Sequence, residues 1–371
     1  MSSYPELVKA LARVKLACTR ANKTSKAIKE EIADTIERAP VDIISGDYLD
    51  QFVVDVYHGG GGVGFNINMN EVLANVANIK RGKNAGDYDP VHPKLHVNCS
   101  QSTADACSTA YRLAIIDLYK ELKEGLVKFI AALDKKRESF KDVSTMARTC
   151  MQDAFPTSMA TLFGGYQTGV KRRLRDLDAG VDRLYLINLG GTVIGTGEGS
   201  TKQYQNIVIG ELSEITGLAL KPRENFSDAA QNIDDLAVVS NQLEQLASML
   251  SKIAKDLRLL SSGPKAGLME LDLPFVQEGS SFFKGKNNPV VPETVINCSL
   301  YVQGLNRTVQ GALDQAELYL NVFEPIAAIC VLDELSSLSK TVSLFRQKCL
   351  VDLDANRKKC QEYVEDYLVE L

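Results

Sequence analysis

The feature that most limits how this chain can fold is an uninterrupted run of apolar residues between positions 236 and 260. The run advances in alternating steps of three and four residues, through Leu236, Val239, Leu243, Leu246, Leu250, Ile253, Leu257 and Leu260. Such spacing draws one apolar stripe along a single face of a long helix. Because the stripe must be buried, we expect a bundle of long, nearly parallel helices.

Other segments show the same helical period. An N-terminal helix is indicated by Leu7, Leu11, Val14 and Cys18. A second long helix is indicated by Leu113, Ile116, Tyr119, Leu122, Leu126, Ile130 and Leu133. A further helical run extends from about 292 to 339, and Pro325 inside it predicts a kink. Strand-like segments are few, so the sequence predicts a mainly α fold with functional loops at the helix ends.

Composition excludes several classes of function. The chain has 45% hydrophobic and 24% charged residues and a net charge of −5, which is typical of an ordinary globular protein. An acidic balance argues against a nucleic-acid or membrane-surface partner, and no apolar run is long enough for a membrane span. The eight cysteines are scattered without a C-x-x-C pair, which indicates reduced thiols in a cytoplasmic protein. The three histidines form no metal-ligand pattern, so no metal is expected.

A glycine-rich stretch follows the apolar segment 52–57. Gly59, Gly61 and Gly64 fit the G-x-G-x-x-G pattern of a dinucleotide-binding turn. That turn needs a second strand ending in an acidic residue, but the segment before Asp87 is polar, and the chain lacks alternating strands and helices. Two interpretations stay open: a flexible turn where backbones pass closely, or a substrate loop whose N–H groups and following helix bind a carboxylate.

Five segments resemble motifs of one enzyme family, in the same order along the chain. Residues 55–75 read DVYHGGGGVGFNINMNEVLAN, similar to D-V-Y-Q-G-G-A-G-T-S-x-N-M-N-x-N-E-V-x-A-N. The segment HPKLHVNCSQSTADACSTAYRLA resembles H/N-P-N-D-H-V-N-x-S/C-Q-S-T/S-N-D, and GSSFFKGKNNPVVPE resembles G-S-S-x-M-P-x-K-x-N-P. Two further motifs of the same family are resembled by the segments ARTCMQDAFP and LGGTVIGTGEGS. The sequence is therefore similar to the aspartase/fumarase superfamily, and to aspartases more than to fumarases.

This resemblance implies a fold and an assembly. We expect an aspartase/fumarase-like long-helix bundle whose central domain forms a helical core on tetramerisation, with each active site drawing residues from three subunits. Residues 1–104 would form a trimmed N-terminal domain with the glycine-rich substrate loop. Residues 105–356 would form the central long-helix domain with the G-S-S loop, and residues 357–371 a stub of the family's C-terminal domain. We expect a homotetramer, or a hetero-oligomer with a homologue.

The resemblance also assigns roles to individual side chains. Ser280 corresponds to the base that removes a proton beside a substrate carboxylate. Lys286, Asn288 and Thr149 correspond to residues that bind this carboxylate, which carries two negative charges once the proton has left. Ser102 and Thr103 correspond to the pair that binds a second carboxylate, and Ser281 is expected to help. A small dicarboxylate is the expected substrate, and no cofactor is implied.

Three positions depart from the family pattern, and all three would contact the leaving group. Threonine after the glycines is replaced by Val63, asparagine by Ala104, and histidine or glutamine by Cys150. An ammonium group losing a hydrogen-bond partner there would be destabilised by roughly 1–3 kcal/mol per partner. Cys150 could instead be a nucleophile. In the loop, Phe283 and Lys284 replace Met-Pro and are expected to alter loop closure.

Two functions from different classes follow. The first is a lyase that eliminates ammonia or another leaving group from a 2-substituted succinate to give fumarate. The second is a catalytically inactive paralogue that acts as a binding, scaffold or partner subunit. Retention of Ser280, Lys286 and Asn288 favours the first, and the changes at Val63 and Cys150 favour the second.

Overall fold

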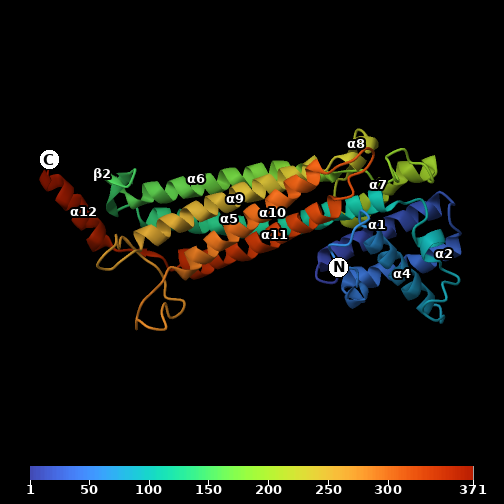
Figure 1. The fold of residues 1–371 in the computed structure, drawn as a ribbon, viewed down its shortest axis with the longest axis horizontal. Coiled ribbons are helices and arrows are strands. Elements are labelled where there is room, and N and C mark those ends of the chain that lie inside the picture. Colours follow the sequence, from blue (N-terminus) through green and yellow to red (C-terminus); the bar gives the residue numbers. More distant parts are fainter. Residues whose placement is uncertain (371) are drawn as a thin grey trace. The chain divides into compact units, whose positions relative to one another are not determined.

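The computed structural model describes residues 1–370, with the backbone alone for residues 368–370. The chain forms two compact units. Unit 1 comprises Met1–Tyr119, Ala179–Ser240 and Asn306–Asp333, and unit 2 comprises Lys120–Asp178, Asn241–Leu305 and Glu334–Leu371. The chain passes from one unit into the other within long helices, drawn in Figure 1.

Unit 2 is built from long helices that lie side by side (Figure 1). They are α6 (Met159–Val181) and parts of α5 (Thr103–Ser139), α9 (Asp234–Leu260), α10 (Val290–Asp314) and α11 (Glu324–Phe345). The predicted stripe on α9 is buried from Leu236 to Leu257, while Leu260 at the helix end is partly exposed. The expectation of a mainly α bundle of long helices is confirmed.

Unit 1 packs shorter helices around α1 (Pro5–Thr24). Helix α1 contacts α2 (Glu30–Ile36), α3 (Arg38–Ser45) and α7 (Lys202–Thr216). Leu7, Leu11, Val14 and Cys18 are fully buried, so the predicted N-terminal helix is confirmed. The unit also contains α4 (Val63–Ile79), α8 (Phe226–Gln231), the single turns η1 (Leu49–Gln51), η2 (Pro93–Val97) and η3 (Asp182–Tyr185), and the paired strands β3 (Leu186–Ile187) and β4 (Lys221–Pro222).

The predicted kink at Pro325 is wrong. The run from 292 to 339 forms two helices, because α10 ends at Asp314 and α11 begins at Glu324. Pro325 therefore lies in the first turn of α11, where its missing N–H removes no helical hydrogen bond. The proline marks a helix start in this chain.

Two elements of unit 2 are absent from the sequence-based expectations. Helix α6 was hidden by glycines, and a hairpin joins β1 (Ser144–Thr149) to β2 (Gln152–Ser158) in antiparallel register. The hairpin turn consists of Cys150 and Met151, whose φ angles are 51° and 64°. Two residues with positive φ are typical of the tight turns that match strand twist. Further along, β5 (Leu271–Asp272) pairs with β6 (Asp354–Ala355), η4 (Arg346–Leu350) ends α11, and α12 spans Arg357–Glu370.

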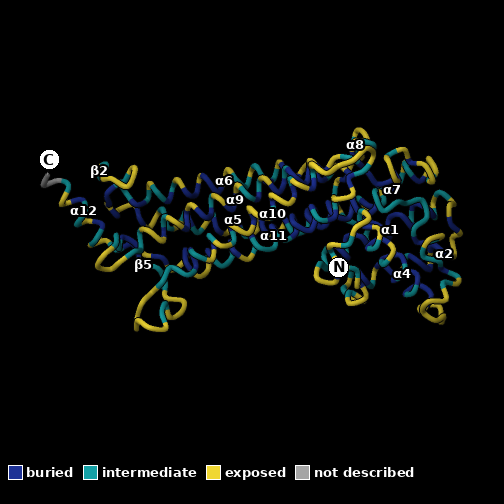
Figure 2. Tube along the Cα trace, in the orientation of Figure 1, coloured by how far each residue is buried: buried dark blue, intermediate teal, exposed yellow. Residues whose placement is uncertain are grey.

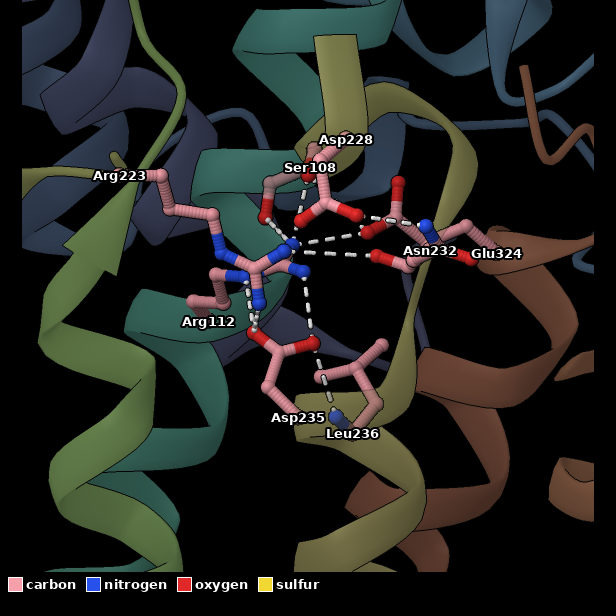
Figure 3. Close-up of polar contacts among 8 residues, drawn as sticks. All are labelled: Ser108, Arg112, Arg223, Asp228, Asn232, Asp235, Leu236 and Glu324. Carbon is pink, nitrogen blue, oxygen red and sulfur yellow. Dashed lines mark hydrogen bonds and ion pairs between the residues drawn. The ribbon is translucent and has the colours of Figure 1, made fainter. Parts of the chain in front are cut away.

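A buried ion-pair network fixes the starts of three helices in unit 1 (Figure 3). Arg112 on α5 donates two hydrogen bonds to Asp235 at the start of α9, at 2.7 and 2.9 Å. Its third nitrogen donates to Glu324 at the start of α11, at 2.7 Å. Arg223 adds a second ion pair to Asp235 at 3.0 Å, so two cations face two carboxylates. Arg112 and Asp235 are almost completely buried.

Within residues 1–370, the structure contains no helix with the length and apolarity to span a membrane. The division predicted from family resemblance, at residues 104 and 356, stays a prediction.

Candidate functional site

The predicted site residues fall into three groups in the structure. The first is in unit 1 and contains Val63, Ser102, Thr103 and Ala104. The other two are in unit 2: the hairpin group, Thr149 and Cys150, and the loop group, Ser280, Ser281, Lys286 and Asn288. Within unit 2, no hydrogen bond or ion pair of the described residues joins the hairpin group to the loop group.

The glycine-rich segment is a turn that begins α4, and no strand precedes it. Residues 53–62 have no helical or extended secondary structure, so the dinucleotide interpretation lacks its first element. Gly62 caps α4 at a φ of 89°, with no side chain bonded to the first helical N–H groups. A Cβ at Gly62 would lie 2.8 Å from the Tyr111 hydroxyl and 3.7 Å from Thr103 Cγ2. Only glycine therefore fits, and it brings Val63 and the open N-terminus of α4 beside Thr103.

Ser102 and Thr103 lie at the start of α5. The Ser102 hydroxyl accepts the N–H of Ala104 at 3.2 Å, and the Ser102 N–H donates to Asp105 at 2.9 Å. Thr103 Oγ1 accepts a hydrogen bond from the side chain of Asn66 on α4, at 3.1 Å. The helix N-terminus carries partial positive charge, so both hydroxyls lie where an anion is stabilised.

Asp105 connects this start of α5 to a second glycine-containing loop. Its other oxygen accepts the N–H groups of Gly190 and Thr192, at 3.0 and 3.1 Å. Burial raises the pKa of Asp105, while the N–H groups of Ser102, Thr192 and Gly190 oppose that rise. The segment LGGTVIGTGEGS is thereby tied to the segment that holds Ser102.

The hairpin group depends on a buried carboxylate. Glu270 is fully buried, and it accepts hydrogen bonds from Thr145 and from Arg148, the latter at 2.6 Å. The Arg148 guanidinium lies over the ring of Tyr363 on α12, 4.9 Å from its centre. Both bonds from β1 fix the strand that ends at Thr149, and the tight turn then exposes Cys150.

The loop group lies between β5 and α10, in a segment that Figure 2 shows as largely exposed. The loop closes on itself at Gly279, whose N–H donates to the Lys286 carbonyl at 3.0 Å. The Asn288 side chain donates to the Gly279 carbonyl at 2.5 Å. A Cβ at Gly279 would lie 2.1 Å from the Lys286 carbonyl oxygen, so the closure requires glycine.

Ser280 follows directly after this closure. Its hydroxyl oxygen accepts two backbone N–H groups, from Phe282 at 3.0 Å and from Phe283 at 2.9 Å. Two converging N–H donors are the arrangement that stabilises negative charge on an oxygen. Lys286 and Asn288 belong to the same closed loop, which places a cation and an amide on the same short segment as the serine.

The histidines have local partners. His92 accepts the N–H groups of Lys94 and Leu95 and so caps η2, while His96 accepts the N–H of His92 at 2.9 Å. Burial lowers the pKa of His96, and His92 lowers it further. Among the described residues there is no group of three or more His, Cys, Asp or Glu that could hold a metal ion.

Sequence reasoning missed three residues that shape these groups: Lys15, Asn66 and Asp105. Lys15 gave a signal, because a lysine stands inside the apolar repeat of the first helix. Asp105 also gave one, because it matches the family's aspartate after Q-S-T-N. Asn66 shows its role only through a contact with a residue distant in sequence, Thr103.

Comparison with known proteins decides the family. Residues 4–304 match the family model described as Lyase. The chain belongs to the aspartase/fumarase family of lyases. It is 36% identical to the aspartate ammonia-lyase of Escherichia coli K12 and 39% identical to that of Pseudomonas aeruginosa PAO1; it aligns over 98% of its length, and over 76% and 77% of theirs.

Solved structures agree with this assignment. A fumarate lyase:delta crystallin from Brucella melitensis bound to cobalt superposes with a TM-score of 0.96 at 38% identity, over 98% of this chain and 79% of that one. A class II fumarase from Schistosoma mansoni superposes with a TM-score of 0.94 at 30% identity, over 97% and 78%. The mainly helical fold is therefore that of fumarate lyases.

Proposed function

We propose that the protein is a lyase that eliminates a leaving group from a 2-substituted succinate to give fumarate. The observation that carries the proposal is the pair of backbone N–H groups, from Phe282 and Phe283, that converge on the Ser280 hydroxyl oxygen. A serine is a weak base at neutral pH unless its alkoxide is stabilised. Two N–H donors and Lys286 in the same loop provide that stabilisation.

The reaction divides between the three groups of residues. Ser280 takes the proton from the carbon beside one carboxylate, and Lys286, Asn288 and Thr149 stabilise the charge that builds on that carboxylate. Ser102 and Thr103, at the start of α5, hold the other carboxylate. The bond to the leaving group then breaks, and the electron pair left by the proton forms the double bond of fumarate.

The proposed leaving group is either ammonia or a group that requires only weak hydrogen bonds from the protein. Overall similarity to aspartate ammonia-lyases supports ammonia. The side chains at Val63, Ala104 and Cys150 support a less basic or bulkier group, because valine and alanine offer no acceptor and a thiol is a weak one.

We further propose that the site is completed by assembly into a homotetramer, in the cytoplasm. The family resemblance implies that three subunits contribute to each site, and the division of the predicted residues into three groups is consistent with this. A small dicarboxylate is the proposed ligand.

The test combines turnover and binding. Purified protein is incubated with fumarate and, in turn, ammonia, hydroxylamine, hydrazine, thiols and nitrite, while fumarate loss is followed by ultraviolet absorbance. We expect turnover with at least one nucleophile, and its loss in Ser280→Ala. The variant should still bind succinate, because Lys286, Asn288 and Thr103 are unchanged; loss of both activities would indicate misfolding instead.

The alternative is a catalytically inactive paralogue that serves as a binding, scaffold or partner subunit. The three altered leaving-group positions favour it. No turnover across the whole panel, together with retained succinate binding, would support this alternative and contradict the lyase.

A further inference from the structure

Lys15 is a buried cation beside the proposed carboxylate site. It lies on α1 with no exposed surface, between the buried residues Val14 and Leu16. Its ammonium group donates to Asn98 Oδ1 at 3.1 Å and to Gln101 Oε1 at 2.8 Å. A buried lysine is costly unless its donors are used, so a cation at this position requires an explanation.

A chain of amide groups leads from Lys15 to Thr103. Asn98 Oδ1 also accepts from Asn66 Nδ2 and from Asn70 Nδ2, each at 3.1 Å. The Asn66 amide makes a second donation, to Thr103 Oγ1 at 3.1 Å. Asn66 and Asn70 are nearly fully buried, so these bonds are shielded from water.

The Lys15 ammonium group fixes which group donates and which accepts in each hydrogen bond between Lys15 and Thr103. An ammonium can only donate, so Asn98 must turn its carbonyl oxygen towards Lys15. Asn66 must then present its NH₂ group, because its own oxygen would otherwise face the oxygen of Asn98. Thr103 Oγ1 consequently receives a hydrogen bond from inside the protein. Its proton is left to point outward, towards an arriving carboxylate.

Asn66 supports this description through its other atom. Its Oδ1 is buried and has no hydrogen-bond partner among the described residues. An amide free to rotate would use that oxygen to accept the Thr103 proton. The observed orientation leaves a buried acceptor unpaired, which is unfavourable, and the charge of Lys15 holds the amide in that orientation.

The groups that face Lys15 do not cancel its charge by direct contact. Cys18 on α1, with Cys107 and Asp105 on α5, are the groups that act on it electrostatically. Burial raises the pKa of Cys18 and of Cys107 to about 12, so both thiols are neutral near pH 7. Asp105 is occupied by three backbone N–H groups. Among the described residues, no ion pair includes Lys15.

We infer that Lys15 is a positioning residue that orients the Thr103 hydroxyl as a donor to the substrate carboxylate, through Asn98 and Asn66. The inference rests on the proposed function, because it needs a dicarboxylate bound at Ser102 and Thr103. Lys15 touches no substrate in this arrangement. Its effect is the direction of the Thr103 proton, three hydrogen bonds away through Asn98 and Asn66.

The test is a double-mutant cycle on ligand binding. Succinate dissociation constants are measured calorimetrically at pH 7 for the wild type, Lys15→Met, Thr103→Val and the double variant. Methionine replaces most of the apolar stem of the lysine and removes the donors, so the amides can rotate and sequester the Thr103 proton. We expect Lys15→Met to weaken succinate binding about tenfold, as for one hydrogen bond to a charged group, and Thr103→Val to do the same.

The double variant separates positioning from general damage. If Lys15 acts through Thr103, Lys15→Met should add almost no further loss in the Thr103→Val background. If the losses of succinate affinity in the two single variants instead multiply in the double variant, the residues act independently and the inference is overturned. Asn66→Ala gives a second cycle with Thr103→Val, for which the same non-additivity is expected, should Lys15→Met fail to fold.

A matched control completes the design. Tyr204→Phe removes another buried hydrogen bond to α1, from the Tyr204 hydroxyl to Cys18, and should leave succinate binding unchanged. Wild-type protein that binds no succinate would overturn the proposed function and this inference with it. If the wild type and Lys15→Met bind succinate equally well, the inference is overturned and the proposed function is not affected.

Discussion

At the scale of single residues, three side chains depart from the family's motifs. Val63 is the first residue of α4, Ala104 lies in the first turn of α5, and Cys150 is exposed in a tight turn. Each lies next to a residue that we propose binds a carboxylate. We therefore expect the binding of the dicarboxylate and the choice of leaving group to be separable by mutation.

The first prediction restores all three positions together. Val63→Thr, Ala104→Asn and Cys150→Gln return hydrogen-bonding groups to the proposed leaving-group pocket. We expect kcat/KM for aspartate to rise at least about tenfold, because each restored partner is worth roughly 1–3 kcal/mol. The measurement is the initial rate of fumarate formation. Unchanged aspartate turnover, with succinate affinity retained, would mean that these side chains do not face the leaving group.

The second prediction concerns Lys15 and pH. Burial lowers the pKa of Lys15 from 10.5 to about 8, whereas a lysine in the unfolded chain titrates near its ordinary value. Below pH 8 the cost of burying the charge is fully present. Between about 8 and 10.5 the folded state binds fewer protons than the unfolded state, so this group makes the protein more stable as pH rises.

The experiment compares the free energy of unfolding of the wild type and Lys15→Met by urea titration at pH 7 and pH 10. Other titrating groups are shared and cancel in the difference. We expect the wild type to gain stability relative to the variant on going to pH 10. A difference that is independent of pH would show that Lys15 titrates normally.

At the scale of elements, the starts of α5, α9 and α11 are held together by buried charge (Figure 3). Arg112→Met should therefore be severely destabilising, because it leaves the buried Asp235 and the partly buried Glu324 short of a cation. We expect a loss of about 3–5 kcal/mol in the free energy of unfolding.

The control for Arg112→Met is Lys123→Met, which removes an ion pair with Asp178 in which both side chains are more than a third exposed. That change should cost less than about 1 kcal/mol. Both variants are compared by chemical denaturation with the wild type. Equal losses in the two would show that burial does not govern these pairs.

Elements differ in how well the sequence predicts them. The α9 stripe was predictable because one helix face must be buried along its length, and the three- and four-residue spacing of its apolar residues indicates that face. Helix α6 was hidden because its glycines suggest a loop. One of them, Gly169, instead makes room for a neighbour on α9, since a Cβ there would lie 2.4 Å from the Met249 side chain. Helix-packing glycines cannot be told from loop glycines by sequence pattern alone.

The candidate site shows the same limit. Resemblance to family motifs predicted roles for Ser280, Lys286 and Thr103, because those residues stand within recognisable segments. The hairpin turn was not foreseen, since Cys150 and Met151 are unusual residues at positive φ. The amide chain behind Thr103 was also not foreseen, because Lys15 and Asn98 are 83 positions apart and meet only in the folded unit.

At the scale of the whole molecule, the proposed completion of the site by assembly can be tested by mixing variants. If three subunits contribute to each site, two inactive variants should complement each other. Ser280→Ala and Ser102→Ala, each inactive alone, are mixed, dissociated in mild denaturant and reassembled. We expect activity to return, because some mixed sites then receive an intact Ser280 from one subunit and an intact Ser102 from another. If light scattering shows that tetramers have re-formed but activity does not recover, one subunit supplies both residues to a site.

The tight turn of the hairpin gives the protein a built-in chemical reporter. Of the eight cysteines, all within the described residues, Cys150 is the exposed one, and the rest are buried or partly buried. A maleimide dye should therefore label this thiol first, without any engineering. If Cys150 borders the leaving-group pocket, saturating succinate should slow the labelling, and the protection would report ligand occupancy even in variants that catalyse nothing.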